Sequence, residues 1–158
     1  MEDEEISIFP ERTVVYAGFG QRFAAMMIDG IIIAIPGYAI KRMTGGQDSI
    51  VELIKTGQIS DASKLSDSII LILHWVYMCA MESGPAQASI GKMAMGIIVT
   101  DVDGNRISFS KATGRFFSKY LSLITLAVGY FMMLWDNKNQ TLHDKIAGTL
   151  VVAKKHYN

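Results

Sequence analysis

A long apolar block near the start of the chain carries an arginine and an aspartate, and this combination constrains the fold more than any other feature. The block covers residues 19–40, contains Arg22 and Asp29, and ends at Lys41 and Arg42. The stretch after Arg22 has about 18 residues, which at about 1.5 Å per residue can cross a bilayer core of about 30 Å when flanking residues help. An ionised group at that depth is costly unless it is paired or hydrated. The block therefore predicts a membrane-spanning helix whose charges find partners on other segments.

Two further apolar blocks lead us to predict an all-α membrane protein with two to three transmembrane or re-entrant helical segments. Residues 69–81 are broken only by His74 and are short for a span, so either flanking residues extend them or the bilayer thins locally. Residues 116–135 are long enough to span on their own. Between the first two blocks, the spacing of Ile50, Leu53 and Ile54 favours a short amphipathic helix on the membrane surface.

The composition excludes several classes of function. Lys plus Arg and Asp plus Glu balance at 15 each, so we expect no nucleic-acid partner, which would need a broad basic face. His74, His143 and His156 lack the spacing of metal ligands, and the chain contains no glycine-rich phosphate loop. No nucleophile, base and orienting residue fall together, so we expect neither an enzyme nor a bound metal or cofactor.

The charged residues of the first block can be matched with residues of the second. Arg22 and Asp29 lie on one helix face about 10 Å apart in height, so they cannot pair with each other. If the two blocks span in opposite directions, Glu82 lies at the depth of Arg22 and His74 at the depth of Asp29. Two pairs are therefore candidates, Arg22–Glu82 and Asp29–His74. They are interpreted either as part of an ion or proton relay or as fixed polar contacts between helices.

Two short segments have the residue composition of β-strands. Residues 97–100 are β-branched, an Asp-Gly turn follows, and residues 107–109 alternate, which together predict a local β-hairpin. Residues 149–153 form another strand-like run. If both runs lie on the cytoplasmic side, residues 97–100 can pair with residues 149–153 and satisfy each other's backbone groups.

The distribution of basic residues bears on the topology. If all three blocks span, Lys and Arg divide into about seven and about eight, which is no bias. If residues 116–135 instead enter and leave on the cytoplasmic side, about eleven lie inside and four outside, namely Lys41, Arg42, Lys55 and Lys64. The positive-inside rule favours this second arrangement, whereas the length of the third block favours the first. The N-terminus is acidic where a secretory signal would be basic, so we expect it to stay in the cytoplasm.

Three stretches in order carry recognisable motifs. Residues 16–29 include Arg22 and Asp29, residues 89–99 include a Gly-Lys pair followed by Gly96, and residues 140–149 include Asp144. Together they resemble the RDD family of small multi-pass membrane proteins, named for an arginine and two aspartates. The resemblance covers residues 16–153, between a polar N-terminal tail (1–15) and a C-terminal tail (154–158).

This resemblance implies that Arg22 and Asp29 are the family's arginine and first aspartate. It implies that the second aspartate is Asp144, with Asp136 as the alternative. The family is usually considered transport-related, and cation/proton exchange has been proposed for some members.

Six polar residues are thus candidates for an ion path or for structural charge pairs: Arg22, Asp29, His74, Glu82, Asp136 and Asp144. Three short segments cannot enclose a path alone, so we expect a homo-oligomer or a larger complex within the lipid bilayer of the inner or plasma membrane. The alternative is a non-transporting scaffold or assembly factor whose charges only hold the fold.

The end of the chain gives the sharpest structural prediction. The guanidinium of Arg22 keeps its charge, so it needs an anionic or carbonyl partner. Glu82 and Asp144 are the two candidates. We expect residues 136–148 to fold back on the cytoplasmic face, and Asp144 to lie close to Arg22. The alternative is that Asp144 only caps the turn that follows it.

Overall fold

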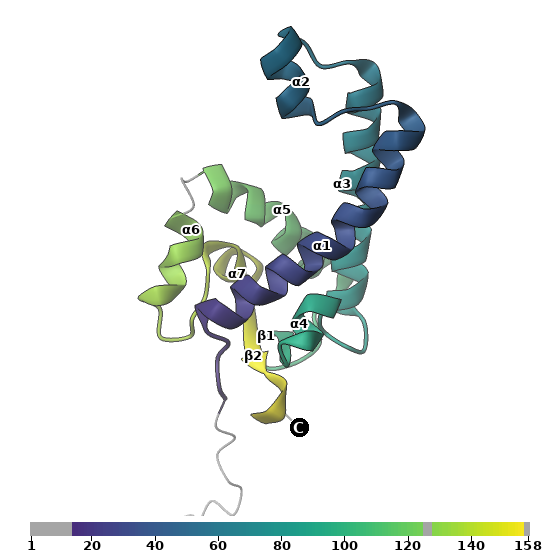
Figure 1. The fold of residues 1–158 in the computed structure, drawn as a ribbon. Helices are drawn as coiled ribbons and strands as arrows, with labels where there is room; N and C mark the ends of the chain where they lie inside the picture. The colour runs from purple at the N-terminus through teal and green to yellow at the C-terminus, as the bar shows by residue number, and fades with distance from the viewer. Residues whose placement is uncertain (1–13, 125–127, 157–158) are drawn as a thin grey trace, which may run out of the picture.

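The computed structural model describes residues 14–124 and 128–156. Two long helices, α1 (Phe19–Thr44) and α3 (Asp61–Ser83), lie side by side and form a hairpin, with the short helix α2 (Ser49–Thr56) between them at one end. The remaining elements gather around the opposite end of this hairpin (Figure 1). The predicted short amphipathic helix is confirmed as α2, which leaves Ile50 and Ile54 largely exposed, whereas its place on a membrane surface stays a prediction.

Helices α1 and α3 are long and apolar enough to cross a membrane, and they are the two such helices among the described residues. Only 17% of the apolar stretch of α1 and 22% of that of α3 is buried against the rest of the protein. A core helix of a soluble protein would bury most of that surface, so these helices need another apolar environment. The second apolar block therefore does extend to spanning length, from Asp61 to Ser83.

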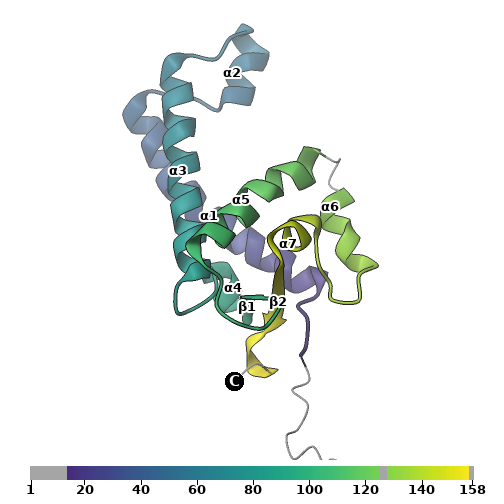
Figure 2. The ribbon, with the colours of Figure 1, turned by 180° about the vertical axis from the view of Figure 1, so that it is seen from behind.

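The third apolar block does not form one long helix. It is divided between α5 (Phe109–Ile124), α6 (Val128–Phe131) and the short 3₁₀ helix η1 (Met132–Leu134). Figure 2 shows α5 rising obliquely from the base of the hairpin and α6 descending beside it. This arrangement agrees with a re-entrant or in-plane segment, and differs from a third straight span.

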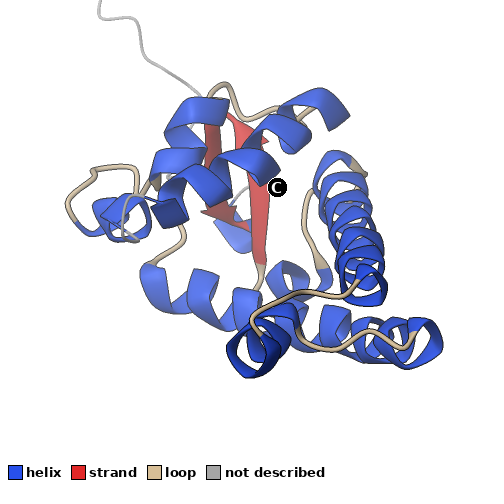
Figure 3. Cartoon of the chain, turned by 90° about the horizontal axis from the view of Figure 1, so that it is seen from above, coloured by secondary structure: helices blue, strands red, loops and turns tan. Residues whose placement is uncertain are grey.

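A small antiparallel sheet lies at the base of the hairpin, surrounded by helices (Figure 3). Strand β1 (Ile97–Asp101) pairs with β2 (Thr149–Ala153), from Ile97 opposite Ala153 to Asp101 opposite Thr149. The predicted pairing of these two runs is confirmed. Residues before α1 add to the free edge of β2, where the Ala17 amide donates to the Val151 carbonyl at 2.9 Å.

The predicted local hairpin is wrong. After β1 the chain turns, and the carboxylate of Asp101 accepts hydrogen bonds from the amides of Asp103 (3.0 Å) and Asn105 (2.7 Å). Residues 105–108 form no strand, and α5 begins directly afterwards at Phe109. The cause is that β2 already pairs with β1. A second strand from residues 105–108 would have to compete with β2 for β1.

The remaining short elements connect the sheet to the helices. Helix α4 (Ile90–Ala94) precedes β1 and packs on α1, whereas α7 (Leu142–Ala147) precedes β2 and packs on α5. Residues Lys154–His156 form a final turn, η2. The apolar core where these elements meet combines small and medium-sized side chains with Met78 and Phe116, and the largest fully buried side chain in the described protein is that of Arg115. The interior at this end is therefore polar as well as apolar.

Candidate functional site

The C-terminal motif places one carboxylate at the centre of the base. Asp144 lies in the first turn of α7, where its Oδ2 accepts a hydrogen bond from the amide of Thr141 at 3.2 Å. Gly148 ends α7 in the left-handed conformation (φ 59°), which glycine adopts at little cost, and the chain turns there into β2. Asp144 is fully buried, at 0% exposure, so its charge requires strong partners.

One partner is the arginine of the first helix, as expected. Nη1 of Arg22 forms an ion pair with Oδ2 of Asp144, and Nη2 donates to the carbonyl oxygen of Asn139 at 2.8 Å. Its Nε also points at the Ala17 carbonyl, 3.3 Å away. The prediction that Asp144 lies beside Arg22 is confirmed, and the contact joins the start of α1 to α7.

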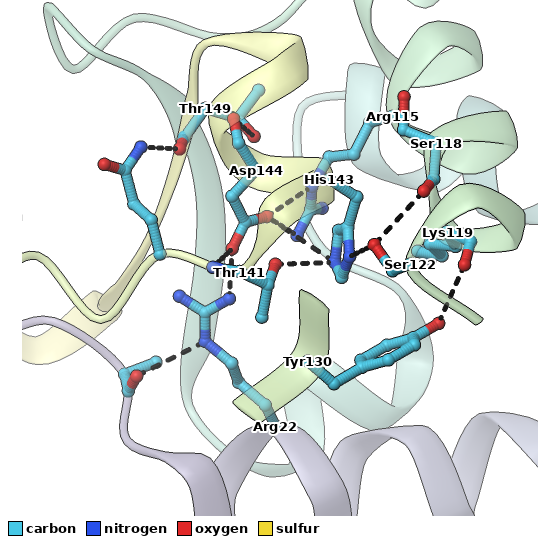
Figure 4. A network of polar contacts seen from close by, with 12 residues as sticks. Arg22, Arg115, Ser118, Lys119, Ser122, Tyr130, Thr141, His143, Asp144 and Thr149 are labelled. Carbon is cyan, nitrogen blue, oxygen red and sulfur yellow. Dashed lines mark hydrogen bonds and ion pairs between the residues drawn. The ribbon is translucent and has the colours of Figure 1, made fainter. Parts of the chain in front are cut away.

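The other partner is an arginine that was not among the predicted site residues. Arg115 of α5 donates from Nε (2.9 Å) and Nη2 (2.7 Å) to Oδ1 of Asp144. Its Nη1 reaches Oε2 of Glu82 at 2.8 Å, and the other oxygen of Glu82 pairs with Lys92. The five residues Arg22, Asp144, Arg115, Glu82 and Lys92 therefore form a chain of alternating charges, here called the charge network, part of which is shown in Figure 4.

The surroundings hold Asp144 in its ionised form. Burial acts to raise the pKa of this carboxyl, but the guanidiniums of Arg115 and Arg22 outweigh it and keep the pKa well below its ordinary value. Beside it, burial lowers the pKa of His143 to about 3, so that imidazole is neutral at physiological pH. The ring nitrogens of His143 contact the hydroxyls of Thr141 (3.0 Å) and Ser122 (3.5 Å). His143 therefore contributes hydrogen bonding to this region, and no charge.

Asp29 has different partners from those predicted. Its carboxylate accepts hydrogen bonds from Tyr77 Oη (2.9 Å), Ser89 Oγ (2.5 Å) and the amide of Gly91 (2.8 Å). The predicted Asp29–His74 pair is not formed, and the His74 ring instead meets Phe116 edge-on, with centroids 5.2 Å apart. The reason is that the start of α4 packs on α1 and supplies its own donors to the carboxylate. Asp29 therefore ties α1 to α3 and α4.

Two other expectations need correction. Arg22 and Glu82 do not pair directly, because Arg115 lies between their sites and binds both Asp144 and Glu82. Asp136, the alternative second aspartate, lies outside the charge network. It pairs with Lys145 at 2.6 Å near the surface and accepts hydrogen bonds from the amides that follow it.

Two basic residues of the site, Arg115 and Lys119, could have been recognised as facing the core from one pattern in the sequence. Residues at helical spacing along α5 form a single buried or half-buried stripe that mixes basic with small and apolar side chains. Because this stripe faces the core, its basic members require internal anions. The members of the stripe are Ala112, Arg115, Phe116, Lys119 and Ser122.

A cavity of about 340 Å³ lies beside the charge network. Its walls come from α1, α3, α5 and the segment around α6, and apolar side chains make up most of them. The charged groups in its lining are four basic side chains and one carboxylate, that of Asp29. The basic residues are Arg22, Lys92, Arg115 and Lys119.

Comparison with known proteins gives the family. "Uncharacterized protein YxaI" of Bacillus subtilis (strain 168) is 28% identical over 87% of this chain and 97% of its own length. "Uncharacterized membrane protein YteJ" of the same organism is 28% identical over 92% of this chain and 85% of its own length. "Proline-rich antigen" of Mycobacterium leprae (strain TN) is 32% identical over 49% of this chain and 31% of its own length. No solved structure matches the chain.

The family and the relative named as a membrane protein support a membrane protein here too. They agree with the two exposed apolar helices. The family model for RDD matches residues 16–148, the range that contains Arg22, Asp29 and Asp144. The protein belongs to the RDD family.

Proposed function

We propose that this chain is a multi-pass protein of the cell membrane that acts in transport, as a homo-oligomer or as a subunit of a larger membrane complex, and that it is not an enzyme. The observation that carries this proposal is the cavity with its four basic groups at the base of two exposed apolar helices. Charged groups kept at membrane depth usually mark a path or a binding site. Two such helices enclose no pore, so a complete path needs further copies or partners.

The charges around the cavity favour an anion over a cation as the transported or coupled ion. Asp29, the carboxylate in the cavity lining, already accepts three hydrogen bonds. His74 does not contact it as a proton relay would require, and His143 is neutral. The four basic side chains exceed by one the three carboxylates around them, Asp29, Glu82 and Asp144, and this net positive charge disfavours a cation.

A flux assay in proteoliposomes tests transport. Lys119 is the variant of choice, because it lines the cavity and takes no part in the ion pairs of the charge network. We expect anion flux into vesicles that contain the wild type, and a strong reduction for Lys119→Gln. Lys111→Gln on the same helix is the control and should keep the wild-type flux. Absence of flux for a panel of anions and cations from folded wild-type protein would reject the transport proposal.

A second candidate function, a non-transporting membrane scaffold, is favoured by the charge network itself. Its ion pairs link α1, α3, α4, α5 and α7, and they satisfy both Glu82 and Asp144. On this reading the charges serve stability alone. It predicts that Lys119→Gln and Lys111→Gln behave alike in every flux measurement, while substitutions within the charge network lower the melting temperature.

We place the N-terminus and the base of the molecule on the cytoplasmic side. The far end of the hairpin carries Lys41, Arg42, Lys55 and Lys64, which leaves 11 of the 15 basic residues for the other side.

Single cysteines at Gln58 and Asp103 test this orientation in intact cells, since the native Cys79 is buried. An impermeant thiol reagent should label the Gln58→Cys protein and spare the Asp103→Cys protein. The reverse pattern would invert the orientation.

A further inference from the structure

We propose that the cavity holds the anionic head of a membrane amphiphile, whose apolar chain leaves sideways between α1 and α5. This inference rests on the proposed function, since it names the ligand class of the same cavity. The shared chemistry is a phosphate or carboxylate group that carries one negative charge.

The charge balance of the region leaves one basic group without a carboxylate partner among the residues that the structure describes. Among the described residues, Arg22, Lys92 and Arg115 are held by ion pairs, whereas Lys119 forms no ion pair with a carboxylate. Its ammonium group lies 5.9 Å from the centre of the Phe116 ring. The four basic side chains at the cavity face three carboxylates, Asp29, Glu82 and Asp144, which leaves an excess of one positive charge. A singly charged anion would balance it.

The rest of the lining is suited to an apolar chain. Phe19, Phe23, Met26 and Tyr120 line the cavity and are also 39–53% exposed, so they form its open side. Pockets of this size, with mostly apolar walls and a few polar groups, are typical of organic ligands. An inorganic anion would leave those walls without a partner, whereas an acyl chain would cover them.

The depth of the cavity fits a ligand that comes from the bilayer. Arg22 lies in the first turn of α1, and Asp29 lies about 10 Å further along the helix axis. The cavity therefore extends from the end of a candidate span, the level of lipid head groups, to the level of the first part of the acyl chains. A lipid can enter from the side without crossing water.

Lipid retention measured by native mass spectrometry tests this inference. Purified full-length protein is mixed with phosphatidylglycerol, with phosphatidylcholine as the neutral lipid of matched chains. We expect phosphatidylglycerol to be retained selectively. Lys119→Gln should bind it about tenfold more weakly, as expected for the loss of a charge-assisted hydrogen bond, and Lys111→Gln should bind as the wild type does.

A second variant keeps the charges and fills the space. Gly30 lines the cavity, and a Cβ atom added there meets nothing within 4 Å, so we expect Gly30→Leu to fold and its longer side chain to displace the lipid. Gly20→Leu on the same helix is the control, since a Cβ atom added there also meets nothing within 4 Å and Gly20 does not line the cavity. Reduced retention for Gly30→Leu alone supports the inference.

Three outcomes would overturn it. The first is equal retention of the two lipids, and the second is equal binding by the Lys119 and Lys111 variants. The third is competition by inorganic phosphate that matches phosphatidylglycerol, which would assign the site to a free anion. The flux assay is independent: selective lipid binding without flux rejects transport and keeps this inference, whereas flux without lipid selectivity rejects this inference and keeps transport.

Discussion

Arg115 donates two hydrogen bonds, at 2.9 and 2.7 Å, to a single carboxylate oxygen of Asp144, and thereby leaves the other oxygen for Arg22. Both residues are almost completely buried, at 2% and 0% exposure. Such a pair contributes little net stability compared with apolar packing, but breaking it leaves an uncompensated buried charge. The stability of the folded protein should therefore fall when any one member of the charge network is removed.

The first prediction concerns Asp144. Asp144→Asn leaves Arg22 and Arg115 without their shared anion, and should lower the free energy of unfolding by about 3 to 5 kcal/mol. The measurement is thermal or denaturant unfolding in detergent. Asp136→Asn is the matched control, because its ion pair with Lys145 is partly exposed and should contribute about 1 kcal/mol or less. Equal effects of the two substitutions would contradict a central role for Asp144.

The second prediction concerns the shape of Arg115. Its guanidinium reaches Asp144 and Glu82 at once, which a lysine ammonium cannot do with the same geometry. Arg115→Lys should therefore destabilise the protein by about 2 kcal/mol, although the charge is unchanged. Arg106→Lys, at an exposed position, should leave the unfolding midpoint where it is. A wild-type midpoint for Arg115→Lys would mean that charge alone matters here.

The third prediction tests the close approach of α4 to α1. A methyl group at Gly91 would collide with the carbonyl oxygen of Ala25 and lie 2.9 Å from Cγ of Asp29. Gly91→Ala should cost about 2 kcal/mol, since α4 must move away and loosen the hydrogen bonds to Asp29. Gly114→Ala, where the added group meets nothing within 4 Å, should stabilise helix α5 by up to about 1 kcal/mol. Opposite shifts of the melting temperature are the expected result.

The fourth prediction is a loss of stability in mild acid. The pKa of His143 is lowered from 6.5 to about 3 by burial, so below pH 6.5 the unfolded chain binds a proton that the folded protein does not. Stability due to this residue is therefore complete above pH 6.5 and falls as the pH drops toward 3. The loss should reach about 2 kcal/mol by pH 5.

A variant isolates the contribution of His143 to this pH dependence. His143→Gln removes the titrating group, so its melting temperature should change less between pH 7 and pH 5 than that of the wild type. The depressed pKa of Asp144 acts only below its ordinary value of 3.8, outside this interval. Identical pH profiles for the two proteins would show that His143 is protonated without cost.

Much of the architecture could be deduced from the sequence, because apolar blocks and strand-like residue patterns are local properties of the chain. The spanning length of α1, the amphipathic α2 and the pairing of β1 with β2 all follow from periodicity and composition. The Arg22–Asp144 contact followed from the same reasoning, since the pairing of β2 returns the end of the chain to the start of α1. A charge that cannot be neutralised needed a partner there.

The rest depended on contacts between residues far apart in the chain. The periodicity of α5 marks Arg115 as facing the core, but its two partners, Glu82 and Asp144, converge from α3 and α7, which no local pattern encodes. The donors to Asp29 come from the start of α4, so the predicted partner His74 packs on an aromatic ring instead. Hydrophobic patterning specifies which face of a helix is buried. Which charges meet within that buried region depends on the packing of several helices at once, because each ion pair must offset the desolvation of both its members.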